Sequence, residues 1–441
     1  MNLSRRRETP RAVSVRAQVY SGALVLGLLL GAYGWIVMKH SGGDFHTLYL
    51  AGARLMHGGN IYWSPPEVNP QSQCPPGLLK DQLDQIRKLS ADTLINQPIC
   101  VHPNLNPPFF IVLSAPLAKL AFEPAWLLWF TFSITCLWSV IALLWREDLL
   151  AKSKMALGLQ VAASMLYMPT LVNLVMGQVT FQTMLPMMLG WAALRHRHDR
   201  SAGVWLGLAV SLKPFLGLIL VGLVFQRNYR AASAMVVMGL ICGLIGCLAG
   251  GLSIYQDYVD ALGSVNWHAA SWNASLAGFF SRPFGGSQNV PWIDAPWLAR
   301  GLTWVASLMV LNVYLKLMWR MKDLDAVQRA DWLLATSVPA MLLISPLGWI
   351  YYFPMLLPGT LIMWRSSQAV SFPGPYRKAL LCSLILSSVP GELILAREIN
   401  HPLEWFGPSG FYAVALVQLF MLACMAAPRN PAGFPGQHSH A

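Results

Sequence analysis

The chain has 441 residues, of which 55% are apolar and only 11% are charged, and its mean hydropathy is +0.47. This composition is typical of a polytopic membrane protein and excludes a soluble globular domain. The net charge of +12 does not indicate nucleic-acid binding, because the basic residues lie in short turns between apolar segments, as expected of cytoplasmic loops.

The first apolar segment, residues 18–38, is long enough to cross a bilayer. It is too long for a signal peptide and no small-residue cleavage site follows it, so we expect a retained helix. The arginines before it place the N-terminus in the cytoplasm. Residues 39–106 then form a large periplasmic loop with an interfacial helix near 47–58. Asp44 lies at the start of this loop, where membrane meets water.

Two cysteines, Cys74 and Cys100, lie in the same polar loop, whereas the others are in apolar segments. An oxidising periplasm would allow a disulfide between them. Two unpaired thiols are the alternative.

The later apolar segments predict an all-α integral membrane protein with about 11–13 membrane segments, including broken and re-entrant helices. They lie at residues 107–122, 124–145, 154–173, 178–195, 203–212, 214–226, 232–253, 297–318, 332–346, 349–364, 378–396 and 409–426. Residues 1–426 are expected to form one transmembrane domain, in which 255–296 is a second periplasmic loop. Residues 427–441 are expected to form a disordered cytoplasmic tail.

The orientation of the early part of the chain has two solutions. The basic turn at residues 146–154 favours the cytoplasm. That placement requires residues 107–122 to be a half-spanning or re-entrant piece. Simple alternation of spans would instead place the turn outside.

The apolar stretch at residues 201–225 has a basic turn on each side, and both turns are expected in the cytoplasm. One helix cannot begin and end on the same side, and Pro214 breaks helical hydrogen bonding. We therefore expect two short helices that meet near Lys213. Broken helices are tolerated where they line a water-accessible cavity, into which Lys213 would point. Snorkelling of Lys213 to the nearer interface is the alternative.

Polar clusters interrupt the apolar chain in a series that resembles one enzyme family. The matching positions are Asp44, Phe45, Tyr49, Ala53, Leu55, Gly58, Gly59, Tyr62, Pro107, Pro108, Pro116, Gly177, Gln178, Ala202, Gly203, Leu206, Gly207, Leu212, Lys213, Pro214, Asn273, Ser275 and Leu276. In order and spacing they resemble the bacterial polyprenyl-phosphate-mannose-dependent mannosyltransferases of glycosyltransferase family eighty-seven. Two positions depart from the family pattern, since Asn106 replaces a usual tyrosine and Tyr351 a usual histidine.

The resemblance implies a glycosyltransferase-C fold in the bacterial inner membrane. The predicted topology places both termini in the cytoplasm and the active site toward the periplasm. It implies transfer of a hexose, with mannose the family default, from a polyprenyl-phosphate donor to a lipid or glycan acceptor hydroxyl. The expected partners are this donor, this acceptor and membrane lipids. We expect no required cofactor, since no metal-ligand spacing occurs, although a divalent metal remains open.

Asp44 is the candidate general base, because a carboxylate can take the proton of an attacking hydroxyl. A solvated loop aspartate or a helix cap is the alternative. Lys213 is the candidate cation for the donor phosphate, with Arg54 and Arg282 as assistants. The alternative for Arg54 is binding of lipid headgroups from an interfacial helix, and the alternative for Arg282 is contact with lipid only.

Four residues are candidates for sugar or acceptor binding: Gln178, His268, Asn273 and Tyr351. Packing between helices is the alternative for Gln178, and the aromatic belt of a membrane interface is the alternative for the loop around His268 and Asn273. Tyr351 stands where the family usually has a histidine, and this difference indicates either an altered substrate or a less active enzyme. A flippase for lipid-linked sugars and a non-catalytic envelope scaffold are the alternative functions.

Overall fold

The computed structural model describes residues 43–62, 104–151, 153–285, 291–369, 374–389 and 408–428. These residues form α-helices and short 3-10 helices, and the sole extended pairing among them is an isolated bridge between Asn273 and Trp349. The all-α prediction is therefore confirmed. The segment 18–38, the predicted Cys74–Cys100 disulfide and the tail beyond residue 428 lie outside the described residues.

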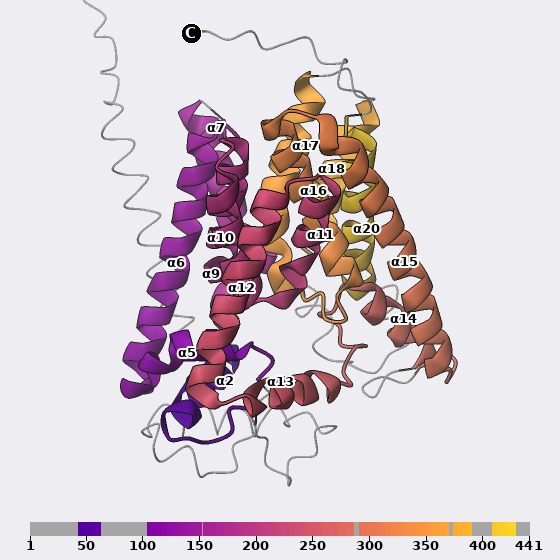
Figure 1. Ribbon diagram of the computed structural model, residues 1–441. Helices are drawn as coiled ribbons and strands as arrows, with labels where there is room; N and C mark the ends of the chain where they lie inside the picture. Colours follow the sequence, from indigo (N-terminus) through magenta and orange to yellow (C-terminus); the bar gives the residue numbers. More distant parts are fainter. Residues whose placement is uncertain are drawn as a thin grey trace, which may run out of the picture. The chain divides into compact units, whose positions relative to one another are not determined.

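The helices follow the predicted apolar segments closely, as the chain order in Figure 1 shows. They are α2 (Gly43–Met56), α5 (Pro108–Ser114), η1 (Ala115–Lys119), α6 (Phe122–Arg146), α7 (Lys154–Leu166), α8 (Met168–Met176), α9 (Thr180–Arg195), α10 (Asp199–Leu212), η2 (Pro214–Gly217), α11 (Leu218–Phe225), α12 (Tyr229–Gly250), α13 (Ser253–Gly263), α14 (Leu276–Phe284), α15 (Pro296–Arg320), η3 (Met321–Asp323), α16 (Ala326–Ile344), η4 (Ile350–Met355), α17 (Leu356–Ala369), α18 (Gly374–Leu386) and α20 (Pro408–Ala426). The helix expected near 47–58 begins earlier, so Asp44 lies in its first turn.

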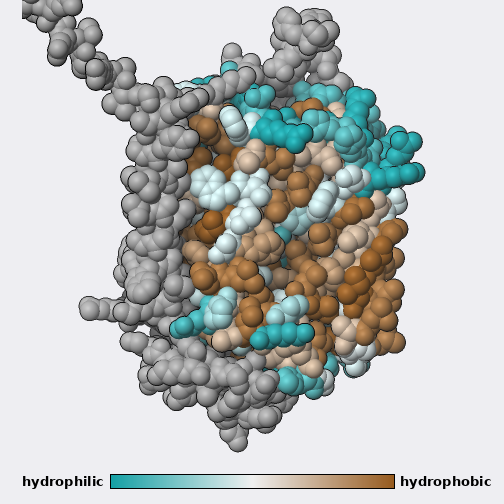
Figure 2. Space-filling view, turned by 90° about the vertical axis from the view of Figure 1, so that its left-hand side faces the viewer, coloured by the Kyte–Doolittle hydropathy of each residue, from teal (hydrophilic) through white to brown (hydrophobic). Residues whose placement is uncertain are grey.

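Three described helical segments are long and apolar enough to cross a membrane: α6, α12 and the continuous run Pro296–Asp323. A fourth span results if α7 and α8, which bend by 51° at their junction, are counted as one. Figure 2 shows hydrophobic residues over the middle of one face and hydrophilic residues gathered toward its upper end. The chain is thus a membrane protein, and the count of about 11–13 segments stays a prediction.

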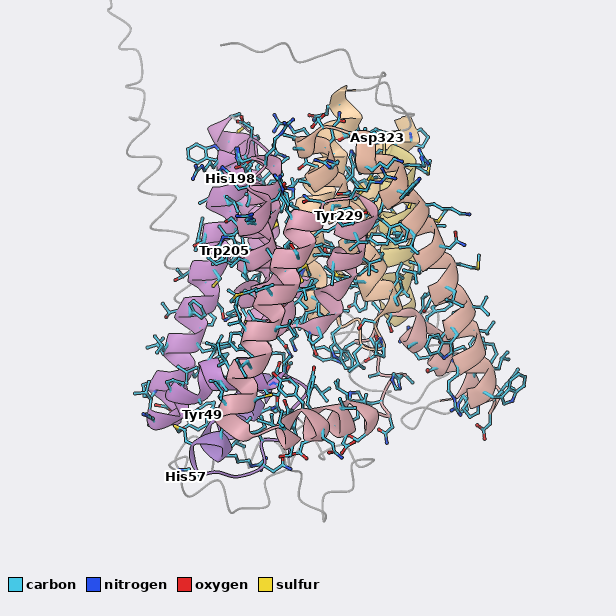
Figure 3. All side chains as sticks on the ribbon, viewed as in Figure 1. Tyr49, His57, His198, Trp205, Tyr229 and Asp323 are labelled. Carbon is cyan, nitrogen blue, oxygen red and sulfur yellow. The ribbon has the colours of Figure 1, made fainter. Side chains whose placement is uncertain are left out.

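An ion cluster decides between the two orientations of the early chain. Glu147 follows α6, and its carboxylate oxygens lie 3.0 Å from Arg195 Nε and 3.0 Å from His196 Nε2, at the end of α9. The turns after α6 and α9 therefore lie at the same end of the protein. This is the end of His198 in Figure 3, opposite the end where Tyr49 and His57 lie.

The segment before α6 is too short to cross the membrane. Helices α5 and η1 together run from Pro108 to Lys119, a length of about 18 Å at 1.5 Å per residue. The hydrocarbon core is about 30 Å thick, so this segment cannot span it. The structure thus favours the solution in which this segment is half-spanning or re-entrant, with the turn after α6 beside the turn after α9.

The predicted break near Lys213 is confirmed. Helix α10 ends at Leu212, Lys213 has extended backbone angles (φ −145°, ψ 103°), and η2 begins at Pro214. The Asn228 amide, beyond α11, donates to Asp199 Oδ1 at the start of α10 over 2.8 Å. Both ends of the broken segment therefore lie together, and its apex carries Lys213.

Two glycines fix α10 against α12. A Cβ on Gly203 would lie 2.2 Å from the Ala231 carbonyl oxygen, and one on Gly207 would lie 2.6 Å from that of Met235. This spacing of small residues allows two membrane helices to approach closely. The close packing fixes where the C-terminal end of α10 lies in the protein. It therefore also fixes the position of Lys213, the next residue.

We predict that Arg195→Met destabilises the protein by about 3 kcal/mol, because breaking a buried ion pair leaves an uncompensated charge. Arg195 Nη1 lies 2.7 Å and 2.8 Å from the two carboxylate oxygens of Asp331, while the Glu147 side chain is only 6% exposed. Thermal unfolding in detergent provides the measurement. Arg200→Met removes an exposed arginine and is the control. Equal stability of the two variants would contradict the ion cluster.

Candidate functional site

Asp44 lies near residues from three distant parts of the chain. The Gln178 side-chain amide donates to Asp44 Oδ2. The Asp44 carboxylate also lies close enough to Lys213 and to Tyr351 and Tyr352 for an electrostatic interaction with each. Asp44, Gln178, Lys213 and Tyr351 are therefore brought together, as their predicted roles in one site require.

Gly177 explains why Gln178 reaches Asp44. It ends α8 in the left-handed region (φ 70°, ψ 32°), which glycine adopts without steric cost. A Cβ there would lie 2.4 Å from Trp126 Cζ3 and 2.8 Å from Phe45 Cβ. The Trp129 indole N–H also donates to the Gly177 carbonyl oxygen over 2.8 Å. The end of α8 is thus pressed against Phe45, the neighbour of Asp44.

Lys213 lies inside the protein, with only 8% of the residue exposed. Its Nζ donates to Asn106 Oδ1 over 2.8 Å and lies 5.6 Å from the centroid of the Tyr352 ring. A buried ammonium group requires such partners, because desolvation of a charge is costly. Lys213 therefore does not reach toward an interface, in contrast to the snorkelling alternative.

Tyr351 and its neighbours are held by the segment that carries Gln178. The Tyr351 carbonyl oxygen accepts from Asn173 Nδ2 over 3.2 Å and from Thr180 Oγ1 over 2.9 Å. The Tyr351 ring contacts Tyr352, with ring centroids 5.0 Å apart, and Trp349, with centroids 6.0 Å apart. These hydrogen bonds thus hold η4 against the junction between α8 and α9.

Asn273 joins two loops through its buried side chain. Its Nδ2 donates to the carbonyl oxygens of His268 (2.9 Å) and Pro346 (2.8 Å). Its Oδ1 accepts from the backbone N–H groups of Gly348 (2.9 Å) and Ser275 (3.2 Å). A contact between this amide and a sugar would require these bonds to break. In this geometry Asn273 therefore holds the loop that contains His268 against the loop that contains Pro346 and Gly348.

The other predicted residues have different surroundings. Arg282 is buried in α14 and donates to the carbonyl oxygens of Asn273 (2.9 Å) and Ala270 (3.3 Å), so it contacts protein, unlike the lipid contact that was its alternative. Arg54 follows Asp44 by ten residues on α2, about 15 Å along the helix. His268 is half-buried, and burial lowers its pKa because desolvation disfavours the charged imidazolium.

Sequence reasoning did not assign a role to Tyr352, Asn106 or Tyr62, although the structure places Asn106 and Tyr352 beside Lys213 and Tyr62 beside Asn106. The Tyr62 hydroxyl donates to the Asn106 carbonyl oxygen over 2.7 Å, while the Asn106 side chain accepts from Lys213. All lie in polar or aromatic clusters that the sequence shows plainly. Their relation to Lys213 arises only when the broken helix brings its apex to them.

No group of three or more histidine, cysteine, aspartate or glutamate side chains that could hold a metal ion is found within the ranges that the structure describes. The expectation that no cofactor is required stays a prediction.

Comparison with known proteins supplies one match. The model of glycosyltransferase family 87 matches residues 104–346, more than half of the chain. Searches of curated proteins and of solved structures find no match. The matched range contains Gln178 and Lys213, whereas Asp44 precedes it and Tyr351 follows it. The predicted family is therefore confirmed, and the identity of the donor and the sugar stays a prediction.

We predict that Gly177→Ala destabilises the protein by at least about 2 kcal/mol, since an alanine here combines a left-handed backbone with a steric clash. Gly158→Ala is the matched control, because Gly158 lies in α7 with nothing within 4 Å of its would-be Cβ. This control should be neutral or slightly stabilising. Thermal unfolding of both variants tests the difference, and a Gly177→Ala protein as stable as the control would contradict it.

Proposed function

The chain belongs to glycosyltransferase family 87, and we propose that it transfers a hexose from a polyprenyl-phosphate donor to a hydroxyl of a lipid or glycan acceptor. The observation that carries this proposal is that a carboxylate, Asp44, lies within electrostatic reach of a buried ammonium, Lys213. The Asp44 carboxylate suits the acceptor, whose hydroxyl proton it can take. The Lys213 ammonium suits the donor, whose phosphate it can stabilise. Mannose is the proposed sugar, as the family resemblance implies.

Asp44 is the general base of this reaction. The acceptor oxygen attacks the anomeric carbon while the bond from that carbon to the phosphate oxygen breaks, and its electrons stay on the phosphate. The hydroxyl proton passes to the Asp44 carboxylate. A positioned base of this kind contributes about 10²–10⁴-fold to the rate. One displacement of this kind inverts the anomeric configuration.

Lys213 stabilises the negative charge that builds on the leaving phosphate. A fixed cation in a site poor in water stabilises such charge far more than it would in bulk solvent. An ammonium group has three N–H donors, and one of them is engaged by Asn106. Lys213 can therefore keep this bond while it contacts a phosphate oxygen.

The active site faces the periplasm in this proposal. Helices α2 and α13 lie near the lower end of the helices in Figure 1, and the ion cluster of Glu147 and Arg195 lies at the other end. The basic turns gather at the end with the ion cluster, which the positive-inside rule assigns to the cytoplasm. This distribution of charge supports an outward-facing position for Asp44.

We predict that Asp44→Asn lowers transfer at least about 100-fold, because an amide cannot accept the hydroxyl proton. The assay uses purified protein in nanodiscs with radiolabelled polyprenyl-phosphate mannose and an extract of acceptor lipids. Asp260→Asn, at an exposed position of α13, is the matched control and should keep wild-type activity. Near-normal transfer by Asp44→Asn, or translocation of the donor without bond cleavage by the wild type, would contradict the proposal.

We predict that Lys213→Gln lowers kcat about 10²–10³-fold through the loss of a cation from the transition state. Lys213→Arg, which retains the charge, should recover part of the rate. The exposed Lys119, on η1, provides the control in Lys119→Gln. A Lys213→Gln enzyme with unchanged kcat would show that this ammonium does not act on the leaving phosphate.

A further inference from the structure

The turn between α8 and α9 contacts two parts of the site at once. Gln178, within this turn, donates to Asp44 Oδ2 on α2. Asn173 and Thr180, on either side of it, both donate to the Tyr351 carbonyl oxygen at the start of η4. The turn therefore joins the proposed base to the segment that carries the Tyr352 ring beside Lys213.

This turn is itself fixed by its own bonds and packing. The Gln178 backbone N–H donates to the Asn173 carbonyl oxygen over 3.0 Å. The Gly177 carbonyl oxygen accepts from the Trp129 indole, and Gly177 packs on Phe45 without space for a Cβ. Gln178 is only 8% exposed. The position of its amide is thus set by the protein before any substrate binds.

We propose that Gln178 is a positioning residue that orients the Asp44 carboxylate, in contrast to the sugar contact expected from its sequence. A carboxylate can rotate about its terminal bond, and a fixed donor at Oδ2 removes this freedom. The direction of the other carboxylate oxygen relative to Lys213 is then fixed as well. The inference rests on the proposed role of Asp44 as base.

The hydrogen bond has a second effect, on the protonation of the base. A donor to a carboxylate favours its charged form, which is the form that accepts a proton. Loss of the donor therefore shifts protonation of the carboxylate to higher pH. The rate depends on the charged form, so the acid limb of the pH–rate profile should move to higher pH as well.

The test compares Gln178→Leu with Gln182→Leu in the nanodisc transfer assay. Gln182 is also a buried glutamine near the start of α9, but its amide donates to Ser133 Oγ over 2.6 Å. We expect Gln178→Leu to lower kcat roughly 10–100-fold, with the KM for donor and acceptor within about 3-fold of wild type. Its acid limb should move up by at least about half a pH unit. Gln182→Leu should leave the pH profile unchanged.

A second variant covers the case in which Gln178→Leu fails to fold. Gln178→Glu places a second carboxylate beside Asp44, and repulsion of like charges should move the acid limb further toward high pH. A rise in KM for one substrate at constant kcat, or an unmoved pH profile in both variants, would overturn the inference. Activity retained by Asp44→Asn would instead defeat the proposed function, so the two failures are distinguishable.

Discussion

The hydrogen bond from Gln178 to Asp44 is the contact on which the site depends. It joins α2 to the junction of α8 and α9, and that junction in turn holds the Tyr351 carbonyl oxygen. Without it, the acid would be one more polar residue in the first turn of α2. With it, the acid has a fixed direction relative to a cation and two aromatic rings. Gly177 makes the contact possible, since any larger residue would push α8 away from Phe45.

The buried charge of Lys213 imposes a second constraint, because an ammonium group inside a membrane protein must be compensated. The break between α10 and η2 places it beside Asn106 and Tyr352, within the electrostatic reach of Asp44. The close packing of α10 on α12 holds the break in position. Desolvation of the Lys213 ammonium is costly, so a buried lysine here suits a function that requires its charge, such as the stabilisation of a phosphate leaving group.

Hydropathy and proline chemistry predicted much of the fold. The break at Lys213 followed from Pro214 and from the basic turns on both sides. The orientation of the early chain could not be predicted, since it depends on Glu147 meeting Arg195, residues distant in sequence. The family motifs identified Asp44, Gln178 and Lys213 as site candidates. Their contacts, like the bond from Asn273 to Pro346, are formed only by tertiary packing.

The anomeric configuration of the product is the most direct test of the central claim, that Asp44 acts as base in one displacement. The measurement is an NMR determination of the glycosidic linkage made by the purified protein in nanodiscs from a donor of known anomeric configuration. The account predicts a product of the opposite configuration. Retention of configuration would contradict it, because a single displacement by an acceptor oxygen on the face opposite the leaving phosphate inverts the anomeric carbon.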